Sequence, residues 1–514
     1  MARGVFPLLT EGEAMAATKR QRPVPRLPIG FADAPADLVR ARREMINKIG
    51  QVYEQFGFEP LETPALEYAD CLGKFLPEAD QPTGGVFAFR DSDGLEQWLS
   101  LRYDLTAPLA RFFAEHDRDE SFPKPFRRWQ VGPVWRDERP GPGRFREFIQ
   151  CDFDTVGAAS IAADAEVCLV LASAFDALGI AQGDYEIRVN NRKILNGILD
   201  QAGARTDEAR LTTLRALDKL DRLGIEGVRH LLGKGREDET GHFTPGAGLS
   251  PDQQAVIEGF LGTTAATRGE AIAHFRTLVG DHKDGNEGVD ELARIADLLD
   301  ASDMGENRVK FDPSLVRGLA YYTGPVFEAV LTFNVLDETG HRRSFGSVAG
   351  GGRYDDLVMR FTGQQVPATG ASIGVDRLLS ALRILGRVQA EKRHGPVVVS
   401  VMDQKRLPDY QRLVNELRAA GIVAELYLGN PKKFGKQLEY ADARRSPAVI
   451  IAGGDEFARG EVAIKDLRLG AELAARLHGL EDTEAYQQQI KSEAQRSVAR
   501  GDVVAEVRRI LARA

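Results

Sequence analysis

The stretch FRRWQVGPVWRDERPGPGRFREFIQCDFD, residues 126–154, decides the fold of this chain because its side chains alternate as they do along paired strands. Within Trp129–Trp135 every odd position is apolar, whereas Arg128 and Arg136 fall on the opposite face. The turn RPGPG, Arg139–Gly143, is made of residues that reverse a chain. The sequence therefore predicts an antiparallel β-hairpin with one apolar and one polar face.

The polar face of this hairpin allows two interpretations. On the return strand it carries Arg144, Arg146, Gln150, Asp152 and Asp154. Arginine offers a fixed fork for phosphate oxygens, and carboxylates or an amide can hold an amine or an imidazole. A substrate that is part phosphate and part polar organic molecule fits such a face, but so does an exposed face of surface salt bridges. The hairpin alone leaves both interpretations open.

Three glycine-containing segments add to the case for a ligand site. They are LVRGLAYYTGPVFEAV (315–330), SVAGGGRYDDL (347–357) and TGASIGVDRLLSAL (369–382). Three adjacent glycines predict a turn whose backbone can approach a ligand closely. The last segment predicts a strand and then a helix whose first turn carries Arg377, where an arginine can face a phosphate. GNPKKFGKQ (429–437) is not a P-loop, because its glycines are one residue too far apart and Gln437 replaces Ser or Thr.

Composition sets limits on the class of protein. A chain of 514 residues exceeds one hydrophobic core. The net charge of −9 argues against nucleic-acid binding through bulk electrostatics, although local basic patches remain compatible with it. Three cysteines without a CxxC pair argue against disulfides and structural zinc, and they fit a reducing cytoplasm. No apolar run approaches the ~20 residues of a membrane helix, so no membrane association is expected.

Periodicity predicts an order of domains along the chain. We expect a flexible N-terminal extension at 1–36 and a β-rich core made of 37–191 and 304–390, interrupted by a helical insertion at 192–303. An α/β domain with at least partly parallel strands is expected at 395–480, followed by a helical tail at 481–514. The segment FEPLETPALEY (58–68) is strand-like, and its two prolines suit an edge or an interface.

Several of these segments together resemble one family. VGPVWRDERPGPGRFREFIQCDFD looks like motif 2 of class II aminoacyl-tRNA synthetases, in the form found in histidyl-tRNA synthetases. LVRGLAYYTGPVFE and GGGRYDDL resemble the two signature peptides of that branch, and TGASIGVDRL resembles motif 3. FEPLETPALEY is similar to the dimer-forming motif 1, and RYDLTAPLAR (102–111) resembles the segment that holds the ammonium group of the amino acid.

The resemblance implies an α+β fold, with a class II antiparallel sheet flanked by helices, a helical insertion and a C-terminal α/β anticodon-binding domain. It implies a homodimer and an ATP-dependent ligase. That enzyme activates L-histidine with ATP and Mg²⁺ to histidyl-adenylate, releases pyrophosphate, and transfers histidine to the 3′ end of tRNA(His). The alternative is a catalytically silent, synthetase-like regulatory subunit of histidine biosynthesis. Such proteins typically lack the anticodon domain and some of the signature residues, whereas this chain has the domain and the signature residues.

The resemblance also implies roles for individual residues. Arg317 and Arg136 are expected to be catalytic, and no residue is expected to ligate a resident metal. The residues expected around histidine are Asp104, Leu105, Thr106, Gln150, Asp154, Tyr321, Tyr322 and Tyr354. The residues expected to bind ATP are Arg136, Glu138, Arg144 and Arg377. Ala320 departs from the pattern, because the first signature peptide usually has an acidic residue there.

Overall fold

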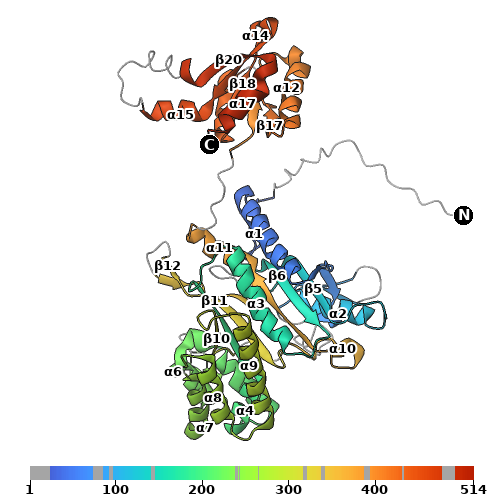
Figure 1. Ribbon diagram of the computed structural model, residues 1–514, viewed down its shortest axis with the longest axis vertical. Helices are drawn as coiled ribbons and strands as arrows, with labels where there is room; N and C mark the ends of the chain where they lie inside the picture. Colours follow the sequence, from blue (N-terminus) through green and yellow to red (C-terminus); the bar gives the residue numbers. More distant parts are fainter. Residues whose placement is uncertain are drawn as a thin grey trace, which may run out of the picture. The chain divides into compact units, whose positions relative to one another are not determined.

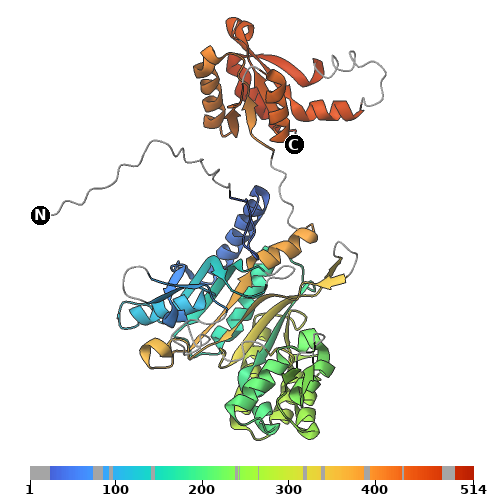
Figure 2. The same ribbon diagram turned by 180° about the vertical axis from the view of Figure 1, so that it is seen from behind.

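The structure is a computed structural model in which the chain forms two compact units, residues 1–390 and 391–514 (Figures 1 and 2). It describes residues 23–72, 85–91, 97–139, 145–237, 241, 243–263, 265–316, 321–336, 342–386, 394–430, 433–476 and 492–513. The predicted N-terminal extension lies largely outside these residues.

An eight-stranded sheet forms the centre of the first unit. Its strands, in spatial order, are β1 (Glu59–Pro60), β5 (Phe126–Trp135), β6 (Glu147–Val156), β15 (Ala368–Gly374), β14 (Ser347–Arg353), β11 (Pro325–Leu331), β7 (Tyr185–Asn191) and β10 (Val309–Phe311). Neighbours pair antiparallel except at the two edges, where β1 and β10 run parallel to the strands beside them. This confirms the α+β class, and the pairing of β5 with β6 confirms the hairpin.

Helices cover one face of this sheet. They are α1 (Ala36–Gln55), α3 (Ala162–Ala177) and α11 (Val375–Ile384), and Figure 1 shows α3 lying along the sheet. In α1 the apolar residues Met45 and Ile49 recur at helical spacing and are buried in the same core as Phe153 of β6. Because side chains alternate along a strand, the hairpin's polar residues point to the other face.

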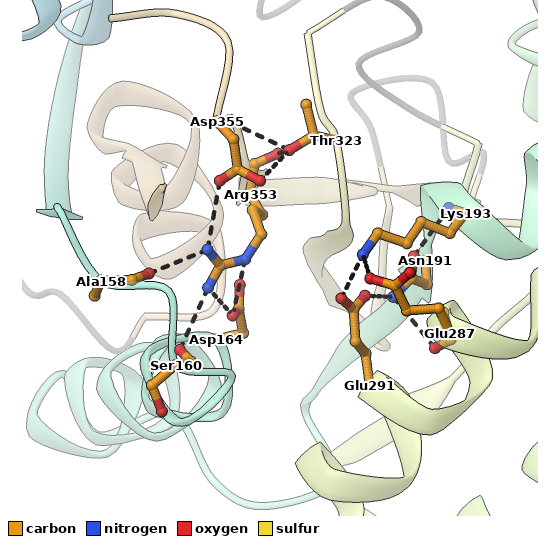
Figure 3. A network of polar contacts seen from close by, with 11 residues as sticks. Ala158, Ser160, Asp164, Asn191, Lys193, Glu287, Glu291, Thr323, Arg353 and Asp355 are labelled. Carbon is orange, nitrogen blue, oxygen red and sulfur yellow. Dashed lines mark hydrogen bonds and ion pairs between the residues drawn. The ribbon is translucent and has the colours of Figure 1, made fainter. Parts of the chain in front are cut away.

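The helical insertion leaves the core after β7 and returns at β10. It consists of α4 (Arg192–Gln201), α5 (Asp207–Leu217), α6 (Leu220–Leu232), α7 (Pro251–Leu261), α8 (Arg268–Val279) and α9 (Lys283–Ala301), with a short hairpin of β8 (Gly235–Glu237) and β9 (Phe243–Pro245). Asn191 caps α4 and donates to Glu291 of α9 at 2.7 Å, and Lys193 pairs with both Glu287 and Glu291 (Figure 3). These contacts fix the base of the insertion on the end of β7.

The segment FEPLETPALEY divides between two sheets. Pro60 ends β1 at the edge of the central sheet, where a missing N–H is tolerated. Its second half forms β2 (Leu66–Tyr68) in a small sheet with β4 (Trp98–Leu101) and β3 (Ala88–Arg90). The helix α2 (Thr106–His116) follows this small sheet. Outside these sheets the first unit also contains η1 (Ala69–Leu72), α10 (Met359–Thr362), and the paired strands β12 (Asn334–Leu336) and β13 (Arg342–Ser344).

The second unit is an α/β domain whose sheet has the order β17-β16-β18-β19-β20. Its elements are β16 (Val397–Val399), η2 (Gln404–Arg406), α12 (Leu407–Ala419), β17 (Ala424–Leu426), α13 (Phe434–Ala443), β18 (Ala448–Ile451), α14 (Gly454–Arg459), β19 (Glu461–Asp466), α15 (Leu467–Arg476), β20 (Gln495–Ala499), η3 (Arg500–Asp502) and α17 (Val503–Leu511). The parallel pairing of β16 with both β17 and β18 confirms the predicted mixture of strand directions.

The prediction of a separate helical tail at 481–514 is wrong for the part that the structure describes. Gln495–Ala499 is a strand that pairs antiparallel with β19. Val507 and Ile510 of α17 are buried in the core of the same domain. The strand QRSVA was missed because it lies at a sheet edge and buries little, which leaves it without the apolar alternation of the other strands.

The three adjacent glycines do not form the predicted turn. Gly350, Gly351 and Gly352 lie inside β14, between β11 and β15. A Cβ atom on Gly351 would lie 2.1 Å from the carbonyl oxygen of Gly370, so the neighbouring strand requires glycine there. The close approach that the structure shows here is to the backbone of β15, and the expected approach to a ligand stays a prediction.

The three cysteines, Cys71, Cys151 and Cys168, have free thiols, and burial raises the pKa of each. Across the described ranges, no helix combines the length and the apolar character needed to cross a membrane.

The close packing of β14 against β15 predicts a cost for any side chain at its centre. Gly351→Ala should lower the free energy of unfolding by about 1–3 kcal/mol, because the methyl group has no space. Gly259→Ala on α7, where nothing lies within 4 Å of the added Cβ, is the control and should leave stability equal or slightly higher. Thermal unfolding compares the two variants, and a native melting temperature for Gly351→Ala would contradict the packing.

Candidate functional site

A cavity of about 780 Å³ opens on the face of the central sheet opposite α1 and α3, a size typical of ligand pockets. The middle strands of the sheet form its floor, and α2, the Tyr321–Tyr322 segment and the start of α11 contribute to its walls. Its polar lining residues include Tyr103, Asp104, Thr106, Arg136, Glu138, Gln150, Asp152, Asp154, Tyr321, Tyr322, Tyr354, Ser372, Asp376 and Arg377.

The polar face of the hairpin is buried beneath this cavity. Arg128 is 0% exposed and Asp154 is 3% exposed, and their side chains form an ion pair at 2.9 Å across β5 and β6. The same guanidinium nitrogen, Nη2 of Arg128, also donates to the carbonyl oxygen of Leu105 at 2.9 Å. The interpretation of this face as an exposed surface of salt bridges is therefore wrong, because its central residues are shielded from water.

Three carboxyl groups converge on the cavity, and burial raises the pKa of each. The pKa of Asp152 is raised to about 7, with the nearby Arg128 guanidinium opposing the effect of burial. The pKa values of Asp154 and Asp104 are also raised, mainly by burial. A positively charged group that enters the cavity would favour the ionised form of these carboxyl groups and would be attracted to them.

Three buried acceptor atoms on β6 receive no hydrogen bond within the described part of the chain: Oε1 of Gln150, Oδ1 of Asp152 and Oδ2 of Asp154. Of these, Oδ2 of Asp154 has the ion pair with Arg128. The amide nitrogen of Gln150 donates to the hydroxyl of Ser372 at 2.8 Å, which orients the amide and directs its oxygen elsewhere. Buried acceptors without donors are costly, so a ligand with N–H groups would complete this part of the cavity.

Three tyrosines wall the carboxylate end of the cavity. The hydroxyl of Tyr354 donates to Oδ1 of Asp154. The ring of Tyr321 lies 5.5 Å from that of Tyr354 and 5.2 Å from that of Tyr322, measured between ring centroids. Burial holds the pKa values of Tyr321 and Tyr354 well above the usual range, so both are neutral phenols at ordinary pH.

The start of α2 supplies the opposite wall. One carboxylate oxygen of Asp104 accepts from the backbone N–H groups of Thr106 at 3.1 Å and Ala107 at 2.9 Å, which fixes the side chain at the helix terminus. Asp104 and Thr106 both line the cavity. The predicted contact residue Leu105 does not; its side chain is fully buried, and its carbonyl oxygen holds Arg128.

Cationic residues line the cavity where the hairpin approaches its turn. Arg136 follows β5, donates to the carbonyl oxygen of Tyr103 at 3.2 Å and lies 5.1 Å from the ring of Phe148. Arg377 projects from the first turn of α11, and Glu138 lies exposed at the cavity. The structure thus brings together Arg136, Glu138 and Arg377. Arg144 and Arg317 lie outside the described residues.

The site residues expected from the resemblance leave out several lining residues. Asp152 shares the hairpin face with Gln150 and Asp154, so strand alternation was sufficient to place it in the site. Ser372 lies opposite Asp152 on β15, a pairing that depends on the register between distant segments. The aromatic Phe145 and Phe148 also line the cavity, and no sequence pattern singled them out.

Comparison with known proteins relates this geometry to a family. A family model for histidyl-tRNA synthetase matches residues 30–378. The chain belongs to the histidyl-tRNA synthetase family. A second model, for an anticodon binding domain, matches residues 396–509, which includes β20 and most of α17.

Two relatives in this family cover almost the same length as the chain. The histidine–tRNA ligase of Paracoccus denitrificans (strain Pd 1222) is 55% identical over 498 residues, covering 96% of this chain and 99% of the relative. The histidine–tRNA ligase of Cereibacter sphaeroides is 58% identical over 462 residues, covering 88% and 92% respectively.

Solved structures share the fold of this histidyl-tRNA synthetase family. The crystal structure of histidyl-tRNA synthetase from Nostoc sp. PCC 7120 aligns with a TM-score of 0.67 and 28% identity, covering 95% of this chain and all of that one. A protein described as an ATP phosphoribosyltransferase regulatory subunit/histidyl-tRNA synthetase, from Bacillus halodurans C, aligns with a TM-score of 0.61 and 22% identity, covering 82% and 97%. The latter likeness concerns the fold alone.

The raised pKa of Asp152 predicts a pH-dependent effect of Asp152→Asn. Between about pH 4 and pH 7 the unfolded chain releases this proton and the folded chain keeps it, so stability falls as pH rises through this window. The Asp152→Asn variant does not lose this stability, because the asparagine amide has no proton to release in this pH range. Its melting temperature should match that of the native chain near pH 4 and exceed it near pH 7.5, by an amount equivalent to roughly 1–4 kcal/mol.

Asp297→Asn, on the exposed face of α9, is the control and should show no difference at either pH. Equal melting temperatures for Asp152→Asn and the native chain at pH 7.5 would mean that Asp152 titrates as an ordinary carboxyl.

Proposed function

We propose that the chain is a histidine–tRNA ligase that activates L-histidine with ATP and transfers it to tRNA(His). The observation that carries this is the cavity with carboxyl, amide and phenol groups at one end and arginines at the other. Relatives named histidine–tRNA ligase match nearly the whole chain at more than half identity.

Histidine occupies the carboxylate end of the cavity. Asp104 and Thr106, at the start of α2, hold the ammonium group, in line with the resemblance of their segment to the ammonium-binding one. The imidazole lies among the tyrosines and donates to the unpartnered Oε1 of Gln150 or to the carboxylate of Asp154. The Leu105 carbonyl contributes indirectly, because it holds the guanidinium that orients Asp154.

ATP occupies the arginine end. Arg136, Arg144 and Arg377 bind its phosphates, and Glu138 lies near the adenine. Mg²⁺ accompanies the phosphates as it does in other ATP sites, where the ion keeps several waters and binds through phosphate oxygens and few carboxylates.

The reaction needs positioning and charge neutralisation. The histidine carboxylate attacks the α-phosphorus of ATP, pyrophosphate leaves, and histidyl-adenylate forms. Arg136 and Arg317 stabilise the charge that develops on the α-phosphate. A hydroxyl of the terminal tRNA ribose then attacks the acyl carbon and AMP leaves. Both steps gain most of their rate from holding the reactants in line.

The second unit binds the anticodon, in line with the family match over residues 396–509. We also propose a homodimer formed through the motif 1 region. In the small sheet there, the apolar side chains of Leu66, Tyr68 and Phe89 are 41%, 42% and 46% exposed. Apolar side chains gathered on an exposed face are typical of an interface. Because its substrates are ATP and tRNA and its thiols are free, we place the enzyme in the cytoplasm.

The regulatory-subunit alternative is not favoured. Relatives that are 53–58% identical over most of this chain carry the name of the ligase. The anticodon-binding domain, which such subunits typically lack, spans residues 396–509.

The test is ATP–pyrophosphate exchange, run with each of the twenty amino acids. The expected result is exchange with histidine alone. Arg317→Ala should lower this exchange by about 10²–10³-fold, because one charge-stabilising donor is lost. Arg276→Ala is the matched control, since this arginine is exposed on α8 and pairs with Asp290; it should retain activity within twofold.

If the folded native chain shows no histidine-dependent exchange, the ligase assignment is wrong and the regulatory-subunit alternative is favoured. Normal exchange by Arg317→Ala would show that the role assigned to this arginine is wrong while leaving the ligase activity intact.

A further inference from the structure

Arg353 ends β14 directly before Tyr354, yet its side chain does not line the cavity. It is 5% exposed and extends to the start of α3, where it pairs with Asp164, which is 0% exposed (Figure 3). Nε of Arg353 lies 3.1 Å from Oδ2 of Asp164. The guanidinium also donates to the carbonyl oxygens of Ala158 at 3.1 Å and Ser160 at 3.4 Å. The end of β14 is thereby fixed to the chain between β6 and α3.

The same arginine reaches the segment that carries the pocket tyrosines. The backbone carbonyl of Arg353 accepts from the N–H of Thr323 at 2.8 Å, and its guanidinium donates to Asp355 at 3.4 Å. Asp355 in turn accepts from the hydroxyl of Thr323 at 3.0 Å (Figure 3). Thr323 directly follows Tyr321 and Tyr322, so this network restrains the end of the segment that carries both rings.

Packing adds to these hydrogen bonds. A Cβ atom on Gly324 would lie 3.1 Å from Cδ of Arg353, so the aliphatic part of the arginine rests against the backbone of this segment. A Cβ atom on Gly352 would lie 2.6 Å from the ring of Tyr322. The arginine and its glycine neighbours therefore set where the Tyr321–Tyr322 segment lies relative to β14.

We propose that Arg353 is a positioning residue for the histidine pocket. Its contacts hold Tyr354 and the Tyr321–Tyr322 segment in the positions from which their rings can contact histidine. This rests on the proposed function. Arg353 contacts no substrate; it acts through Tyr354, which donates to Asp154, and through Thr323. The planar guanidinium of Arg353 pairs with Asp164 and Asp355 and also donates to two carbonyl groups, which the single ammonium group of a lysine cannot do.

The experiment compares Arg353→Gln and Arg353→Lys with the native chain in ATP–pyrophosphate exchange. For Arg353→Gln the KM for histidine should rise at least tenfold, while the KM for ATP stays within twofold, because the arginine end of the cavity does not depend on this network. Arg353→Lys should show an intermediate rise, since it keeps the charge opposite Asp164 and loses the fork.

Arg308→Gln is the matched control for a merely structural role. Arg308 is also buried, pairs with Asp176 at 2.7 Å and donates to the carbonyl oxygen of Ala172 in α3 at 3.3 Å, but it lies beside β10 and away from the cavity lining. This variant should lose stability and keep the native KM for histidine.

An unchanged histidine KM in a folded Arg353→Gln would overturn the proposal, as would an equal rise in Arg308→Gln. If Arg353→Gln does not fold, Asp164→Asn and Arg353→Lys replace it in the experiment. The KM for histidine should then rise at least threefold in both variants. Native KM values in both would overturn the proposal. A native chain without histidine-dependent exchange would instead refute the proposed function.

Discussion

The site depends on the ion pair of Arg128 and Asp154, which face each other across β5 and β6 with the guanidinium fully buried. Breaking such a pair by removing one partner costs about 3–5 kcal/mol, because the remaining charge has no water. The pair orients the surrounding groups. Arg128 holds the carbonyl of Leu105 before α2, and Asp154 accepts from the hydroxyl of Tyr354.

The glycines of the neighbouring strands follow from this constraint. Asp154 pairs in register with Gly370 of β15, which in turn pairs with Gly352 of β14. A Cβ atom on Gly370 would lie 2.2 Å from Oδ1 of Asp154, and one on Gly352 would meet the ring of Tyr322. Glycine at these two positions leaves space for the carboxylate and for a tyrosine ring. One row of paired residues across the sheet therefore positions a carboxylate, a guanidinium and a tyrosine ring at the carboxylate end of the cavity.

Local patterns predicted the hairpin, α1, the strand-to-helix step before Arg377 and the α/β character of the second unit, because each is encoded by periodicity over a short stretch. They did not predict the burial of the hairpin's polar face, since alternation separates two faces without saying what covers them. The cover comes from distant segments: Thr63 bonds with Gln130, and Arg102 donates to the carbonyl of Pro133. The position of the glycine triplet inside β14 and the edge strand β20 likewise depend on pairing between segments far apart in sequence. The assignment to one amino acid came from resemblance to a family and not from the pattern of polar residues.

We propose that the buried pair of Arg128 and Asp154 presents Asp154 to histidine. Calorimetric titration of histidine into the double variant Arg128→Met/Asp154→Leu tests it most directly, because replacing both partners by apolar side chains preserves a packed interior. The account predicts a folded protein, with a melting temperature near that of the native chain, whose affinity for histidine is at least a hundredfold weaker. Binding within threefold of the native affinity would contradict it.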